Sequence, residues 1–296
     1  VFAIPLGLIM YLWLAEIEDR LAFARKERAG LEYVVALRRL LEPLALGSPE
    51  VAEAVRGVEV VDARLGAELQ ATEAWQGLRQ KLADPSAGQA ARIADTVQLI
   101  GHVGDTSNLI LDPDLDSYYL MDATVVLLPN VVGALSTIGG ALVEEQTEGP
   151  GAGRQAELLA TLALARAERS AIARGHAVAC GANPQLAAAL APHLKASGAA
   201  VDAVAALVDD GGRGLAVGEV SRRSAAALRA VFAHHGAATV ALDGLLAAGV
   251  PAARVVAGTG CAALRDPVAL SRHALGAGVA RGLVLPPFFF KDFPAA

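Results

Sequence analysis

Cysteine, aromatic and basic residues are all scarce in this chain of 296 residues. The two cysteines, Cys180 and Cys261, are too few for a disulfide framework or a cysteine-rich zinc site. Phe, Trp and Tyr together make up only 4% of the chain. With a net charge of −6 and no basic stripe, the sequence lacks the electrostatic footprint of a nucleic-acid-binding protein. We therefore expect no nucleic-acid partner.

Small and aliphatic residues, above all Ala, Leu and Val, dominate the composition instead. Hydrophobic residues make up 54% of the chain, and the mean hydropathy is +0.44. Intrinsic disorder requires low hydrophobicity and high net charge, so this composition excludes a disordered chain. The length allows one or two domains with a sizeable buried core. A composition rich in Ala and Leu and poor in aromatics is typical of long packed helices.

The first fifteen residues form an apolar run that carries no charged side chain before Glu16. A membrane crossing needs roughly 20 apolar residues, so the run is slightly short. Tyr11 and Trp13 lie near its end, where aromatic residues of the membrane interface are expected. The basic region and the small-residue cleavage site of a signal peptide are not visible. We predict a membrane helix over 1–15 that continues into an extramembrane helix, and the alternative is a buried core helix.

The rest of the chain up to residue 247 predicts helix after helix, joined by short loops rich in Gly, Pro and Asp. The fourth helix is expected to start at Asp112-Pro113 and to kink or break at Pro129. Long helices with short connections favour antiparallel bundles. The predicted fold class is mostly α: a membrane helix, an elongated or double helical bundle over 16–247, and a short C-terminal fragment. The predicted helices cover 16–46, 50–83, 87–111, 112–148, 154–179, 183–209 and 215–246.

A distinctive motif lies in the middle of this helical body. Residues 108–122 read Asn-Leu-Ile-Leu-Asp-Pro-Asp-Leu-Asp-Ser-Tyr-Tyr-Leu-Met-Asp. This segment closely resembles one in the periplasmic sensing regions of some bacterial histidine kinases and chemotaxis receptors. The stretches 27–33, Leu128-Pro129 and 242–246 fit the same group, so the resemblance covers roughly 1–247.

This resemblance implies an extracytoplasmic helical sensor between two membrane spans, coupled to a cytoplasmic signalling module. We accordingly expect attachment to the inner membrane with the bulk of the chain in the periplasm, an unidentified small-molecule ligand, and a homodimer. The sequence departs from this plan after Leu246, where no second membrane helix, HAMP segment or kinase core follows. We therefore expect a sensor module that is incomplete at both ends and has no catalytic residues of its own.

The motif supplies the candidate ligand-binding residues. Asp114, Tyr118 and Asp122 recur at intervals of four residues, so they share one face of a helix, and Tyr119 lies in the neighbouring row. Carboxylates beside phenols can hydrogen-bond a small polar ligand. The same side chains can equally tie one helix to the next, and the sequence leaves both interpretations open.

Histidines offer no metal site in this sequence. His234 and His235 are adjacent, so they point to different faces of a helix. His176 and Cys180 are one helical turn apart, but two ligands do not make a zinc site. No phosphate-binding loop is present either, since the Gly-rich stretch at 211–214 lacks the Lys-Ser/Thr that such a loop needs. We expect neither a metal nor a cofactor.

The C-terminal residues 249–296 differ from the rest. An apolar stretch from Val250 with a Gly turn, a helix over 266–276 and a second apolar strand over 282–285 predict one β-α-β unit. Three pieces of this tail resemble the dihydrodipicolinate synthase family of (β/α)8-barrel lyases, which act through a lysine Schiff base. They are Arg-Val-Val-Ala-Gly-Thr-Gly-Cys-Ala-Ala-Leu at 254–264, His-Ala-Leu-Gly-Ala-Gly-Val at 273–279 and Val-Leu-Pro-Pro-Phe-Phe-Phe-Lys at 284–291.

The family's proton-relay tyrosine falls at Phe290, which has no hydroxyl group and cannot relay a proton. Lys291 does not match the position of the family's nucleophile. The resemblance covers only part of a barrel, whereas barrel chemistry needs groups from several strands. Two alternatives to the sensor therefore remain: a lyase fragment of this family, expected to be inactive, and a purely structural helical adaptor.

Overall fold

The structure is a computed structural model that describes the backbone of residues 3–111, 114–149, 153–211, 214–254, 256–258 and 281–283, with side chains chiefly between residues 21 and 248. It divides into two compact units, one formed by 26–244 and the other by 1–25 together with 245–296. The predicted boundaries at residues 15 and 247 stay predictions.

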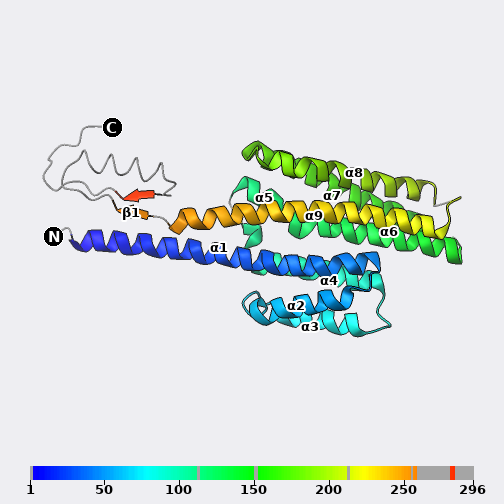
Figure 1. Cartoon of the computed structure of the whole chain (residues 1–296), viewed down its shortest axis with the longest axis horizontal. Coiled ribbons are helices and arrows are strands. Elements are labelled where there is room, and N and C mark those ends of the chain that lie inside the picture. The colour runs from blue at the N-terminus through cyan, green and yellow to red at the C-terminus, as the bar shows by residue number, and fades with distance from the viewer. Residues whose placement is uncertain are drawn as a thin grey trace. The chain divides into compact units, whose positions relative to one another are not determined.

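The described part is mostly helical, as the composition indicates (Figure 1). The elements run in the order α1 (Ala3–Leu46), α2 (Val51–Leu65), α3 (Thr72–Ala83), α4 (Gln89–Thr106), η1 (Leu109–Leu111), α5 (Leu115–Asp122), η2 (Ala123–Leu127), α6 (Leu128–Glu148), α7 (Arg154–Ala182), α8 (Leu186–Asp209), α9 (Val217–Arg254), β1 (Val256–Gly258) and β2 (Arg281–Leu283).

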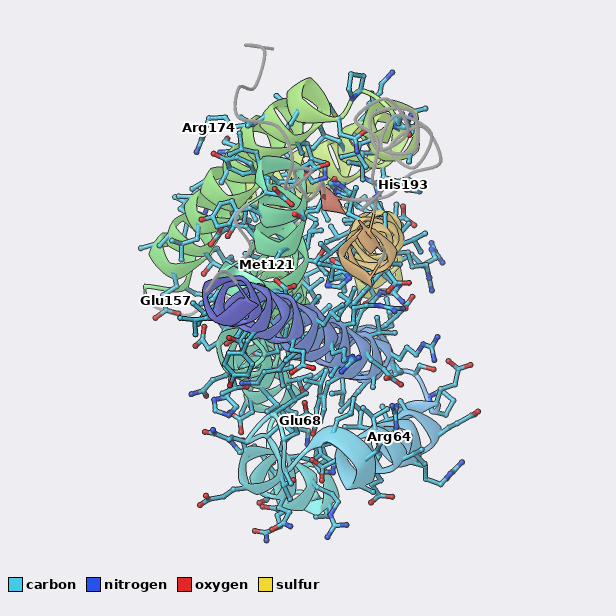
Figure 2. All side chains as sticks on the ribbon, turned by 90° about the vertical axis from the view of Figure 1, so that its left-hand side faces the viewer. Arg64, Glu68, Met121, Glu157, Arg174 and His193 are labelled. Carbon is cyan, nitrogen blue, oxygen red and sulfur yellow. The ribbon has the colours of Figure 1, made fainter. Side chains whose placement is uncertain are left out.

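Within the unit 26–244, α1 occupies the middle. Figure 2 shows α2 and α3 on one side of it, where Arg64 and Glu68 are labelled, and α7 and α8 on the other side, where Arg174 and His193 are labelled. Helix α7 packs against α5, α6 and α8, and α4 packs against α3 and α6. The unit is therefore a layered helical bundle, with α2 and α3 as an outer pair.

The apolar face of α1 explains its central place. Its fully buried residues follow one another at the three- and four-residue spacing that lines one side of a helix. These residues are Tyr33, Val34, Leu37, Leu40 and Leu41. Equally buried side chains lie on other helices of the unit, among them Ile100 and Val103 of α4, Val132 of α6, Val208 of α8, and Val231 and Leu242 of α9.

Helices α1 and α9 pair in antiparallel fashion. Near the start of the unit, Arg28 lies 3.7 Å from the carboxylate of Asp243. Further along, the guanidinium of Arg38 donates a hydrogen bond of 3.1 Å to the backbone carbonyl of Phe232. As the residue number rises on α1 it falls on α9, so residues 26 and 244 lie at the same end of this unit.

The predicted single helix over 50–83 is wrong, because the structure contains two shorter helices, α2 and α3. The break at 66–71 includes Gln70 with a positive φ of 52°. Leu69 and Ala71 in this break are both fully buried, so folding the chain back gains apolar burial that one straight helix would lose. Asp62 closes the corner by accepting hydrogen bonds from Tyr33 and Thr72.

The predicted interruption near Pro129 is confirmed, although its form was not anticipated. Pro129 sits in the first turn of α6, directly after the π-helix η2. Proline has no N–H to donate to the carbonyl four residues earlier, which favours a local change of helical geometry. Upstream, the predicted start at Asp112-Pro113 lies outside the described residues; α5 begins at Leu115, with Asp114 as its N-cap.

The tail differs from its prediction in one respect. Helix α9 continues to Arg254, so the predicted strand from Val250 is wrong for its first residues. Strand β1 follows and pairs in parallel with β2, with Val256 opposite Arg281. The predicted helix over 266–276 lies outside the described residues, and a β-α-β unit is therefore not confirmed.

Two helical stretches are long and apolar enough to cross a membrane. They are Leu115–Glu148 and Val217–Ala248, and 50% and 44% of their most apolar windows are buried inside the protein. Core helices of a folded bundle pass the same test, so the finding fits membrane association only weakly. Both stretches belong to the part of the chain that the structure describes, and the count of two holds for that part.

The close approach of α4 to the π-helix gives a testable consequence. A Cβ added at Gly104 would lie 2.4 Å from Cγ1 of Val125, whereas one added at Gly101 on the same helix would meet nothing within 4 Å. Since the χ1 of valine is stiff, we expect Gly104→Ala to lower the free energy of unfolding by about 1–3 kcal/mol. Gly101→Ala should raise it by about 0.5–1 kcal/mol.

Urea unfolding monitored by circular dichroism measures both changes. Equal effects of the two substitutions would show that α4 does not pack on η2 as described.

Candidate functional site

The four predicted ligand-binding residues all lie on or next to the short helix α5. Asp114 is its exposed N-cap, Tyr118 is 38% exposed and Asp122 is half-buried. Tyr119 faces α7, because a Cβ at Gly175 of that helix would lie 2.9 Å from its ring. The rings of Tyr118 and Tyr119 meet edge to face at 5.2 Å. The motif thus docks α5 onto α7 through Tyr119.

The polar groups of this motif have few partners. Among the described residues, neither phenol hydroxyl takes part in a hydrogen bond, while Asn183 at the end of α7 donates one of 3.1 Å to Asp116. Burial raises the pKa of the Asp122 carboxyl above its usual range. The arrangement shows how α5 is held in place, and ligand contact by these four residues stays a prediction.

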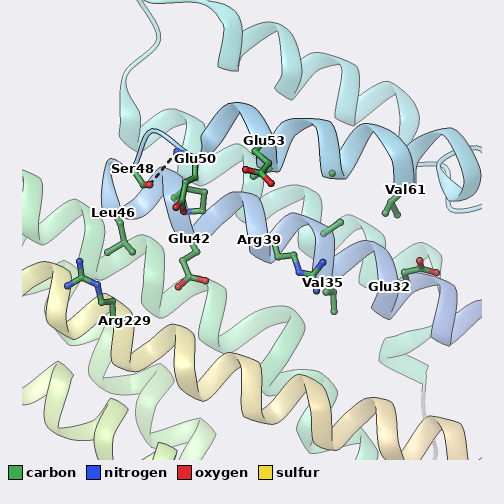
Figure 3. Close-up of a pocket in the computed structure, with 14 residues that line it drawn as sticks. Glu32, Val35, Arg39, Glu42, Leu46, Ser48, Glu50, Glu53, Val61 and Arg229 are labelled. Atoms are coloured by element: carbon green, nitrogen blue, oxygen red, sulfur yellow. Dashed lines mark hydrogen bonds between the residues drawn. The ribbon is translucent and has the colours of Figure 1, made fainter.

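A groove with a volume of about 960 Å³ lies between α1 and α2, with Arg229 of α9 at its edge (Figure 3). All of its lining residues belong to the unit 26–244. Its apolar part includes Val35, Leu46 and Val61. A volume of this size is enough for a small organic molecule, for which pockets of roughly 300–1,000 Å³ are typical.

Charged groups of both signs line the groove. Glu32 pairs with Arg64, and Glu42 pairs with Arg38, so these two acids are already neutralised. Arg39 and Arg229 on one hand, and Glu50 and Glu53 on the other, also line it. Within the described part of the chain, none of these four residues takes part in an ion pair.

Sequence reasoning missed this groove. Its one visible signal is that Glu32, Arg39 and Glu42 continue one charged stripe along α1, next to the apolar stripe that forms the core.

A chain of hydrogen bonds connects three helices in the interior of the unit. Nδ1 of His176 on α7 lies 3.0 Å from the carbonyl oxygen of Ile172, and its Nε2 lies 3.1 Å from Nε2 of His234 on α9. Nδ1 of His234 lies 2.8 Å from the hydroxyl of Ser197 on α8. Both imidazoles are buried, which lowers the pKa of His176 and brings that of His234 to about 3.

His235 lies on the other side of α9 and is also fully buried. Its Nδ1 is 3.2 Å from the hydroxyl of Thr239, one helical turn away. Burial and the positive charge of Arg38 lower its pKa to about 3, while the nearby backbone of Thr124 in the π-helix acts in the opposite direction. Adjacent histidines do point to different faces, as the sequence indicates, but both faces are interior.

Sequence reasoning missed the contact between His176 and His234. The two residues are 58 positions apart and lie on different helices. Nothing in the local sequence of either one signals the other. In the part of the chain that the structure describes, no group of three His, Cys, Asp or Glu side chains could hold a metal ion.

The comparisons with known proteins give one short match. A protein named "Uncharacterized DapA-like lyase" from Chloroflexus aurantiacus is 62% identical over 38 residues. The match covers 13% of this chain and 13% of that protein. No family model matches the chain, and no solved structure matches it either.

This match supports the resemblance to the dihydrodipicolinate synthase family. Its length is far too short to show that the chain belongs to that family. The resemblance of 1–247 to sensor regions is not shown by any comparison. Phe290 and Lys291, which bear on lyase chemistry, lie outside the described residues.

The burial of His235 predicts that acid destabilises the fold. Its pKa is about 3 in the folded chain, against the ordinary value of 6.5. Because the unfolded state binds the proton more tightly, this contribution to stability is complete above pH 6.5 and is lost as the pH falls toward 3. We expect the free energy of unfolding to fall by about 2 kcal/mol between pH 7 and pH 5 for His235 alone.

Urea titrations at both pH values measure this loss. His235→Gln should reduce the difference between them, whereas Gly101→Ala, which changes no titratable group, should leave it unchanged. A wild-type stability that does not change between pH 7 and pH 5 would contradict the described burial.

Proposed function

We propose that this chain is a membrane-anchored ligand-sensing module, the extracytoplasmic helical region of a signalling protein of the histidine-kinase or chemoreceptor type. The observation that carries the proposal is the antiparallel pairing of α1 with α9. This pairing brings residues 26 and 244 to one end of the unit 26–244, and both helices continue beyond these residues. Such an arrangement suits a module that is attached to a membrane through its two end helices, α1 and α9.

The first helical turns support a lipid-facing anchor. Leu8, Tyr11 and Leu12 of α1 are 57%, 69% and 58% exposed. Tyr11 and Leu12 follow Leu8 by three and four residues, which is about one helical turn, so the three side chains lie on one face of the helix. Exposing such a face to water is unfavourable, and a lipid phase removes that cost.

The groove gives the proposed module a place for its ligand. It is lined by α1 and α2 and is bordered by α9, so a bound molecule would contact both of the end helices. The charged and apolar residues that line it together suit a small polar molecule with an apolar part. A ligand that binds one arrangement of α1 and α9 more tightly than another shifts the population toward it, which is how such a signal would leave the module. We expect the module to act as a homodimer in the inner membrane, with its bulk in the periplasm.

The second candidate function is a Schiff-base lyase, favoured by the short match to the DapA-like protein. A lyase of this kind needs a lysine amine of lowered pKa that attacks a carbonyl group. The sequence places Phe290 at the expected tyrosine, and Lys291 does not match the position of the family's nucleophile. A helical adaptor without ligand or activity is the third candidate, and it predicts that the groove stays empty in any metabolite screen.

The anchor is testable with one substitution. We expect Leu8→Arg to move most of the full chain, expressed in bacteria, from the membrane pellet to the soluble fraction. An arginine near the middle of a membrane helix costs about 2.5–3.5 kcal/mol on insertion scales. Leu164→Arg is the matched control. Leu164 of α7 is 65% exposed, and the proposal places this part of α7 in water, so the substitution should not change the partitioning. Equal partitioning of wild type and Leu8→Arg would overturn the proposed anchor.

The lyase alternative has its own test. We expect the mass of the chain to stay unchanged after incubation with pyruvate and sodium borohydride, which reduces a lysine Schiff base to a stable adduct. Mass spectrometry of the intact chain detects the adduct, and peptide mapping locates it. A stoichiometric adduct on one lysine would replace the sensor-only proposal with the lyase.

A further inference from the structure

The buried chain of His176, His234 and Ser197 has determined proton positions. The carbonyl of Ile172 can only accept, so Nδ1 of His176 carries a proton and donates it. Nε2 of the neutral His176 is then an acceptor, and Nε2 of His234 must be the donor in the bond of 3.1 Å between them. Nδ1 of His234 is left as an acceptor, so the hydroxyl of Ser197 donates to it over 2.8 Å.

The same arrangement of side chains can hold one more proton while every hydrogen-bonding group keeps a partner. Ser197 has a second acceptor within reach, since its hydroxyl lies 3.2 Å from the carbonyl of Leu194. When a proton is added to Nε2 of His176, it can donate to His234. The proton of His234 then sits on Nδ1 and is donated to Ser197, whose hydroxyl turns to Leu194. Every group still has a partner, and the two bonds that His234 makes, to His176 and to Ser197, have reversed their direction.

The surroundings of the pair set how readily it takes this proton. The groups whose charge acts on His234 are His176 of α7, His193 of α8 and His235 of α9, and all of them oppose a positive charge. Arg169 of α7 lies near Ser197, where both line a cavity of about 10 Å³, and its charge is compensated by an ion pair with Asp202. Burial acts in the same direction, so the site fills only in acid.

We propose that His176, His234 and Ser197 form a buried binding site for a single proton, filled by reversal of the two hydrogen bonds that His234 makes to His176 and to Ser197. The two imidazoles share the added charge, and a second proton would leave two donors facing each other across the 3.1 Å contact. The site joins α7, α8 and α9, so uptake of the proton places a positive charge where α9 contacts α7 and α8. This inference does not depend on the proposed membrane anchor or on a ligand in the groove.

Nitrogen-15 NMR of histidine side chains in the full chain tests the neutral state. At pH 8 we expect His176 to be protonated on Nδ1 and His234 on Nε2, which are opposite tautomers. Identical tautomers would contradict the assignment of the chain.

A titration from pH 8 to pH 4 tests proton uptake. The signals of His176 and His234 should move together in one step that accounts for one proton, because interacting groups titrate as a pair. Uptake of two protons, or unfolding before either signal moves, would overturn the proposal.

Ser197→Ala separates the proposed site from a merely structural contact. It removes the hydroxyl that accepts from Nδ1 of His234 in the protonated state, so we expect the shared midpoint to fall by about one pH unit or more, a tenfold loss of proton affinity. Ser170→Ala is the matched control, because Ser170 of α7 bonds to the Arg166 carbonyl on an exposed face. An unchanged midpoint of proton uptake in Ser197→Ala would contradict the proposed proton-binding site, whatever the variant's stability.

Discussion

The guanidinium of Arg38 is the constraint on which the rest of this fold depends. Its side chain is only 20% exposed, and it donates to the carbonyl of Phe232 and to the carboxylate of Glu42. It also lies 5.9 Å from the centre of the Phe232 ring. Burial lowers the pKa of Arg38, and Glu42 works against that shift. A hydrogen bond that involves a charged group contributes about 1.5–3 kcal/mol, so the bond from Arg38 to the Phe232 carbonyl favours one register of α1 and α9.

Both functional features follow from that register. On one side of the contact, the charged stripe of α1 opens into the groove that α2 and Arg229 border. On the other side, the residues just after Phe232 reach the interior: His234 meets α7 and α8, and His235 meets the π-helix. A shift of α9 along α1 would therefore change the groove and the histidine chain together. This coupling gives the proposed sensor a physical route from ligand to end helix.

Most of the helices could be predicted from the sequence, because apolar residues at helical spacing and Gly or Pro at the ends are local signals. The start of α7 at Arg154, just after a stretch rich in Gly and Pro in the sequence, and the interruption before Pro129 are examples. The split of 50–83 into α2 and α3 could not be predicted in this way. It depends on burying Leu69 and Ala71 in the interior of the unit, which is a tertiary effect that overrides local helical preference.

The candidate site was predicted less well for the same reason. The motif around Tyr118 and Tyr119 was visible because it is contiguous, and the structure shows how Tyr119 docks on Gly175. The groove and the imidazole pair draw on residues from several helices, and only the fold brings these together. Local sequence carries the chemistry of His176 and His234 but not their contact of 3.1 Å.

The antiparallel register of α1 and α9 is the central claim, and chemical cross-linking measures it directly. In a chain with Cys180→Ala and Cys261→Ala, one variant carries Arg28→Cys with Asp243→Cys, and another carries Arg28→Cys with Arg229→Cys. Position 229 lies roughly 21 Å further along α9 than position 243. A short bifunctional maleimide should link 28 to 243 within one chain and leave 28 and 229 unlinked. Linking of 28 to 229 in preference to 243 would contradict the register and with it the shared end from which the proposed sensor is anchored.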